Sequence, residues 1–217
     1  METQPNIPST EQWIAHLESL IAEPLSPVPF DGSDEVKEGY IDSFRDEYGS
    51  KRATDRALLS RVLGVGYEPR SSGREPDLDE RLWDATHDVN TDWRKWVRGV
   101  EGSKDGLVSD DYAIEHRTLI ELSSLHALWH LGDREVVEGL VRWHTRELQP
   151  DNGINRPWGV HVFVACSVES DDTDMRLDAM LHAQTLVNNC CVNLGRPDVL
   201  SAFILRDSTD ALRAINE

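Results

Sequence analysis

Apolar residues recur along most of this chain at intervals of three and four positions, and glycine or proline separates each such segment from the next. That spacing lines up apolar side chains on one face of an α-helix, because the helix turns once every ~3.6 residues. The alternating pattern of a half-buried strand is rare in this sequence. The sequence therefore predicts an all-α fold.

The first part of the chain contains signals for three helices. Ser9 and Gln12 form a capping-box pattern, in which each side chain bonds the backbone N–H of the other residue, and Pro24 ends that helix. A second helix is expected to end at Gly49, and a third runs from about residue 54 to 64.

The clearest loop of the chain is GVGYEPRSSGREP at residues 64–76, which is rich in glycine, proline and serine. It divides the chain into an N-terminal helical segment (1–64), a linker (65–76) and a main helical body (77–217). One single domain over residues 1–217 is the alternative, because 217 residues suit one globular core.

One long helix is expected over residues 77–99, where apolar positions repeat at spacings of four and three. Asp84, Asp88 and Asp92 follow one another at i, i+4 and i+8 on the opposite face. Facing carboxylates can bind Mg²⁺ or Ca²⁺. His87 followed by Asp88 also resembles the His-Asp pair of metal phosphohydrolases. A solvated acidic face is the alternative interpretation.

Two later segments resemble each other. LHALWHLGDREVVEGL, at 125–140, aligns with NNCCVNLGRPDVLSAF, at 188–203, so that Gly132 falls on Gly195. A glycine after the last turn of a helix lets the chain reverse direction. The alternative explanation is chance similarity between short amphipathic helices.

From this similarity we expect antiparallel helical hairpins at 109–148 and 172–216. The segment WGVHVFVACSV at 158–168 suits either a buried strand or a short buried helix, and its helical neighbours favour the helix. Repeated hairpins of this kind build an α/α array, an arc or a partial toroid.

Residues 127–143, ALWHLGDREVVEGLVRW, resemble one unit of a HEAT-type repeat. Gln149, Gly153 and Trp158 resemble the Gln-containing turn of the α/α toroid superfamily of terpenoid cyclases and glycan-active enzymes, although their spacing is longer than in that motif. The first resemblance implies a helical surface for interactions, and the second implies a glycan-active enzyme.

Four histidines, His126, His130, His144 and His161, lie close together in the sequence. His126 and His130 are one helical turn apart and point the same way, like the two metal ligands of an HExxH helix, but the glutamate of that motif is absent. The four residues are candidate ligands for a divalent metal such as zinc or iron. The alternative is that they are buried histidines satisfied by hydrogen bonds.

A candidate ligand groove combines the turn after residue 150 with two asparagines that match His126 and His130 in the aligned hairpins. Arginine and tryptophan clamp carboxylates or sugars by bidentate bonding and stacking. The alternatives are an ordinary turn and polar contacts that fix helix register. The groove residues are Asp151, Asn152, Asn155, Arg156, Trp158, Asn189 and Asn193.

The formal net charge of −18 argues against nucleic acid and anionic membranes as partners. The N-terminus lacks the basic and apolar regions of a secretion signal, so we expect a cytoplasmic protein. Cys166, Cys190 and Cys191 are odd in number and lack CxxC spacing, which argues against a disulfide framework and a zinc knuckle.

The repeat pattern favours an interaction or scaffold module that presents a groove to a protein partner or to a second copy of itself. The alternative is a metal-assisted hydrolase or a glycan-active enzyme that uses the region of His126, His130, His144 and His161.

Overall fold

The computed structural model describes residues 7–69, 73–88, 90–97, 106–108, 112–147 and 154–216. Within these residues the regular structure is entirely helical, which confirms the all-α prediction. The helices are α1 (Thr10–Ile21), α2 (Asp34–Ser43), α3 (Ala53–Leu63), α4 (Leu78–Ala85), α5 (Arg94–Val97), α6 (Ile114–His130), α7 (Arg134–Glu147), α8 (Val160–Glu169), α9 (Thr173–Cys191) and α10 (Val199–Asn216).

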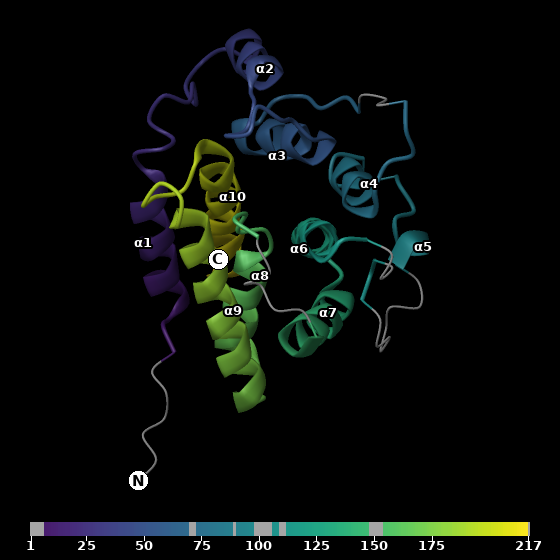
Figure 1. Cartoon of the computed structure of the whole chain (residues 1–217), viewed down its shortest axis with the longest axis vertical. Helices are drawn as coiled ribbons and strands as arrows, with labels where there is room; N and C mark the ends of the chain where they lie inside the picture. The colour runs from purple at the N-terminus through teal and green to yellow at the C-terminus, as the bar shows by residue number, and fades with distance from the viewer. Residues whose placement is uncertain are drawn as a thin grey trace.

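Helices α6, α8 and α10 form the interior of the molecule. In Figure 1, α2 lies at the top with α3 and α4 below it, α1 lies at the left, α6 and α7 lie right of centre, and α8, α9 and α10 lie between α1 and these two helices. Helix α10 packs against α1, α3 and α8, and α6 packs against α4, α7 and α8. Helix α8 reads VHVFVACSVE and is buried from Val160 to Ser167, because a helix that is apolar on every side is stable only inside a protein.

Several local predictions are confirmed. Ser9 and Gln12 form the capping box of α1, and Gly64 ends α3 in the left-handed conformation at φ 68°. The segment 158–168 contains the helix α8 rather than a strand. The second helix, however, ends at Ser43 instead of Gly49, so that prediction was wrong by about one and a half turns.

The prediction of one long helix over 77–99 was also wrong, because α4 ends at Ala85. The hydroxyl of Thr86 donates to the Trp83 carbonyl (2.7 Å). The Asp88 carboxylate accepts bonds from the Asn90 N–H (3.1 Å) and the Thr91 hydroxyl (2.8 Å). Short polar side chains that bond nearby backbone compete with helix formation, and apolar spacing alone did not reveal this competition.

The break in this helix also changes the acidic row that was expected on it. Asp84 lies in α4 and accepts a hydrogen bond from the Tyr67 hydroxyl. Asp88 lies in the turn that follows, and Asp92 lies beyond it. The three carboxylates therefore do not share one helical face, and the proposed Mg²⁺ or Ca²⁺ row loses its basis.

The two aligned hairpins turn alike but pack differently. Gly132 and Gly195 both adopt positive φ (82° and 68°) where the chain reverses. Helix α6 packs against α7, whereas α9 packs chiefly against α8 and α10 chiefly against α1. The segment 172–216 thus holds two successive helices whose main partners lie elsewhere, and the array or toroid arrangement stays a prediction.

One apolar core takes buried residues from all of the helices α1 to α10, so it includes residues on both sides of the 65–76 loop. None of the helices in the described residues has the length and apolar character needed to cross a membrane.

Candidate metal centre

Three of the four predicted histidines converge in the core. A ring nitrogen of His126, of His130 and of His161 lies within 4.8 Å of each of the others. His126 and His130 share one face of α6, and His161 is the second residue of α8, which packs on α6. The apolar character of α8 buries this helix against α6 and therefore brings the third imidazole to the other two.

Asp207 of α10 connects the cluster, although the sequence analysis did not select it. Its Oδ2 accepts hydrogen bonds from His126 Nε2 (2.9 Å) and His130 Nε2 (2.6 Å). Its Oδ1 accepts a bond from Arg61 Nε of α3 (3.1 Å). One carboxylate therefore ties together side chains from three helices.

The hydrogen bonds assign the imidazole protons. The Gly159 N–H donates to His126 Nδ1 (3.1 Å), and an Arg61 N–H donates to His130 Nδ1 (3.0 Å). Backbone N–H and guanidinium groups can only donate, so both Nδ1 atoms are acceptors. Each ring is therefore a neutral imidazole with its proton on Nε2, directed to Asp207.

His161 is held differently. Its Nδ1 lies 3.1 Å from the Ser208 hydroxyl. Its Nε2 is buried and has no hydrogen-bond partner among the described residues. A buried polar atom without a partner is costly, and such atoms commonly mark a missing water, ion or functional contact.

The pKa shifts leave the carboxylate charged and the imidazoles neutral. Burial lowers the pKa of His126 to about 4 and holds the pKa of His161 well below its ordinary value. Burial alone would raise the pKa of Asp207, but His130 and His126 outweigh it, so this pKa lies well below its usual range. An ionised carboxylate beside neutral imidazoles is the protonation state that metal ions require of their ligands.

The cluster is closed and surrounded by aromatic rings. The side chains of His126, His130 and Asp207 are 0%, 6% and 5% exposed. The Trp83 and Trp158 rings each lie 5.3 Å from the His126 ring. An apolar shell of this kind limits solvent access and orients the polar groups inside it.

His144, the fourth predicted ligand, lies apart from the cluster. It belongs to α7, and its Nε2 is 3.9 Å from Glu121 Oε2. The prediction that four histidines gather at one site therefore holds for three of them, because α7 directs its histidine toward a different part of α6.

The predicted groove residues gather only in part. Asn155 donates to Glu47 (3.0 Å) and the Tyr48 hydroxyl (2.7 Å). Arg156 is buried and bonds Asp198. Asp151 and Asn152 lie outside the described residues.

Asn155, Arg156 and Trp158 border a cleft of about 360 Å³. Trp158, however, is only 1% exposed. A side chain so deeply buried has no free face on which to stack a sugar, so the glycan-clamp interpretation loses its main residue. Asn189 is partly exposed and Asn193 is exposed on the surface side of α9 and its following turn, so this pair does not reproduce the environment of His126 and His130.

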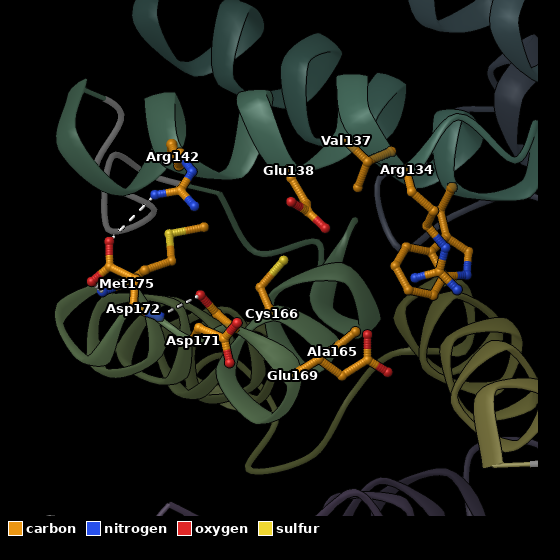
Figure 2. Close-up of a pocket in the computed structure, with 12 residues that line it drawn as sticks. Arg134, Val137, Glu138, Arg142, Ala165, Cys166, Glu169, Asp171, Asp172 and Met175 are labelled. Carbon is orange, nitrogen blue, oxygen red and sulfur yellow. Dashed lines mark hydrogen bonds and ion pairs between the residues drawn. The ribbon is translucent and has the colours of Figure 1, made fainter.

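A second cleft, of about 290 Å³, lies between α7, α8 and α9 (Figure 2). Its wall includes Trp129, whose ring lies 5.3 Å from the His161 ring and 3.6 Å beneath the Arg134 guanidinium. Cys166 also lines it, and burial raises the pKa of this thiol to about 12, so it stays protonated and weakly nucleophilic. All three cysteines are free.

Asp207 and Arg61 are the residues that the sequence analysis missed. The sequence could have identified Asp207, because this carboxylate lies on the apolar face of α10 between Phe203 and Ala211. A carboxylate on a buried face needs a partner. Arg61 lies at the exposed end of α3 and had no such signal.

No family model, curated protein or solved structure matches this chain.

Proposed function

We propose that the protein binds a divalent transition metal, of the zinc or iron(II) class, through His126, His130 and His161. The observation that carries this proposal is the convergence of three imidazoles in the core, one of which has a buried Nε2 without a hydrogen-bond partner among the described residues. Neutral imidazole is the preferred ligand of these metals.

Asp207 is the candidate for a fourth ligand, although its carboxylate is not part of the group whose ligand atoms all lie within 4.8 Å of one another. Its Oδ2 already contacts two of the histidines. Zn–N bonds of about 2.1 Å in a tetrahedron place the ligand atoms about 3.4 Å apart, so the rings need to close by up to about 1.4 Å from the 4.8 Å limit that they now satisfy. With Asp207 as the fourth ligand, the closed site would be typical of a structural metal, whereas catalytic sites keep one position open.

Metal binding requires a change in the imidazole protons. Coordination through Nε2 moves the proton of His126 to Nδ1, which now accepts from the Gly159 N–H. The same shift in His130 affects the nitrogen that faces Arg61. The metal-bound centre therefore needs a small movement at Gly159, directly before α8.

A closed site favours a structural metal over the metal-assisted hydrolase that the sequence offered as an alternative. The interaction or scaffold role stays a prediction, and the two proposals are compatible. A metal that joins α6, α8 and α10 would stabilise the interior of such a scaffold.

The test is metal analysis of untagged protein, stripped with a chelator and then incubated with Zn²⁺ or, without oxygen, Fe²⁺. We expect stoichiometric metal and a higher melting temperature in the wild type and in His16→Ala, a control at an exposed histidine. His161→Gln should lose the metal. The proposal fails if the wild type takes up no stoichiometric metal, or if a folded His161→Gln binds it as the wild type does.

A further inference from the structure

We infer that Arg61 is the gate of this centre: it is the internal cation that neutralises Asp207 in the metal-free protein, and it moves outward when a metal ion enters. This inference rests on the proposed metal site and concerns how the site fills and empties.

Arg61 stands at the edge of the cluster that faces solvent. Its side chain is 38% exposed, whereas that of its partner Asp207 is 5% exposed. His126 and His161 are fully buried. Among the groups that form the centre, the guanidinium is thus the one an incoming ion meets first.

The hydrogen bonds of Arg61 occupy positions that a bound metal changes. Arg61 donates to Asp207 Oδ1 and to His130 Nδ1. When His130 coordinates through Nε2, its proton moves to Nδ1, and two donors then face each other because a guanidinium cannot accept. The present conformation of Arg61 and a metal on His130 therefore exclude one another.

Charge repulsion also disfavours a metal ion at the site while Arg61 stays in its present position. A guanidinium and a divalent cation that share the Asp207 carboxylate repel each other, and this repulsion is stronger inside a protein than in water. Arg61 can leave at low cost, since it lies in the last turn of α3 and is partly solvated. Arg156, by contrast, is 8% exposed and is held by Asp46 and Asp198.

The test compares Arg61→Gln with the control Arg206→Gln. Arg206 precedes Asp207 in α10, pairs with Asp210 and is 40% exposed, so the control removes the same charge at similar exposure. Zn²⁺ uptake by full-length metal-stripped protein and Zn²⁺ release to a chromophoric chelator are followed by stopped-flow absorbance. We expect uptake to be ~10-fold faster in Arg61→Gln, because an opposing charge and two competing hydrogen bonds are gone, and unchanged in Arg206→Gln.

Arg61→Lys provides a second variant in case the glutamine variant does not fold. It keeps the charge but cannot span both acceptors as a guanidinium does, so its uptake should lie between the other two. Equal rates in the wild type and in the folded Arg61 variants would overturn the gate while leaving the metal site intact. Absence of stoichiometric Zn²⁺ in all of the proteins would overturn both.

Discussion

Helix α6 contributes to two buried histidine–carboxylate pairs that behave in opposite ways. Near its C-terminal end, His126 bonds Asp207 at 2.9 Å. Earlier in the helix, Glu121 lies 3.9 Å from His144. All four side chains are at most 5% exposed, yet the pKa of Asp207 lies below its ordinary value and that of Glu121 is raised to about 7.

The number and type of donors explain this difference. Asp207 receives two imidazole N–H groups and a guanidinium N–H, spread over both of its oxygens. Glu121 receives the backbone N–H groups of Leu107 and Val108 on Oε1, both at 2.7 Å, and its Oε2 has no hydrogen-bond partner among the described residues. Burial sets the cost of the charge, and the donors decide whether the carboxylate still ionises.

The two histidines also differ in their hydrogen bonding. Both nitrogens of His126 are hydrogen-bonded, and neither nitrogen of His144 has a hydrogen-bond partner in the described part of the chain. Burial lowers the pKa of both, to about 4 and about 3. Both rings are therefore neutral at pH 7, and the two sites differ in how well their polar atoms are satisfied.

The largest effect is expected for Asp207→Asn, measured by urea unfolding of metal-stripped protein. The change keeps the size of the side chain but removes the buried negative charge that accepts the His126 and His130 N–H groups. Removing one partner of a buried charged network typically costs about 3–5 kcal/mol. A loss below ~1 kcal/mol would show that Asp207 does not hold this network together.

Glu121→Gln should have a smaller effect of opposite sign. Glutamine keeps an oxygen for the Leu107 and Val108 N–H groups and removes the charge that burial disfavours. A gain of roughly 1–3 kcal/mol is expected at pH 8, since one pKa unit corresponds to about 1.4 kcal/mol.

The pH dependence of this gain provides its control. The folded protein binds the Glu121 proton up to a pKa of about 7, whereas the ordinary value is 4.5. The contribution of Glu121 to the free energy of unfolding of the wild type therefore falls as pH rises from 4.5 to 7. Glu121→Gln removes this pH dependence. Equal stability differences at pH 4 and pH 8 would contradict the pKa assignment.

The smallest effect is expected for His144→Leu. Leucine has a similar size and replaces a ring whose two nitrogens make no hydrogen bond with the described residues, so thermal unfolding should show a gain of about 1 kcal/mol. The same substitution at His126 should instead destabilise the protein, because Asp207 and the Gly159 N–H each lose a partner. If both variants shift the melting temperature in the same direction, the two sites are not as different as their hydrogen bonds indicate.

The candidate centre could be predicted in part. The i, i+4 spacing of His126 and His130 fixed their common face, because helical geometry is local. The addition of His161 depended on α8 packing against α6, and the exclusion of His144 depended on the direction in which α7 presents it. Asp207 lies 81 residues from His126 along the chain, and no local pattern connects the two.

The fold likewise combines features that local sequence predicts with features that depend on tertiary packing. The capping box at Ser9 and the glycine turns at Gly132 and Gly195 follow from nearby residues and were predictable. The continuous helix over 77–99 was predicted from apolar spacing, and the hydrogen bonds of Thr86 and Asp88 to their neighbours end it. The sequence similarity of the two hairpins predicted their glycine turns. It did not predict which helices they pack against, because distant apolar faces determine those partners.

The sequence by itself determined that this protein is helical, where most of its helices begin and end, and that two histidines share a face. These properties depend on the backbone and on neighbours within one or two turns. Only the tertiary structure decided that His161, Asp207 and Arg61 join those histidines and that Asp207 stays charged where Glu121 does not. Convergence depends on which apolar faces pack together, and a buried charge depends on the donors that distant segments bring to it.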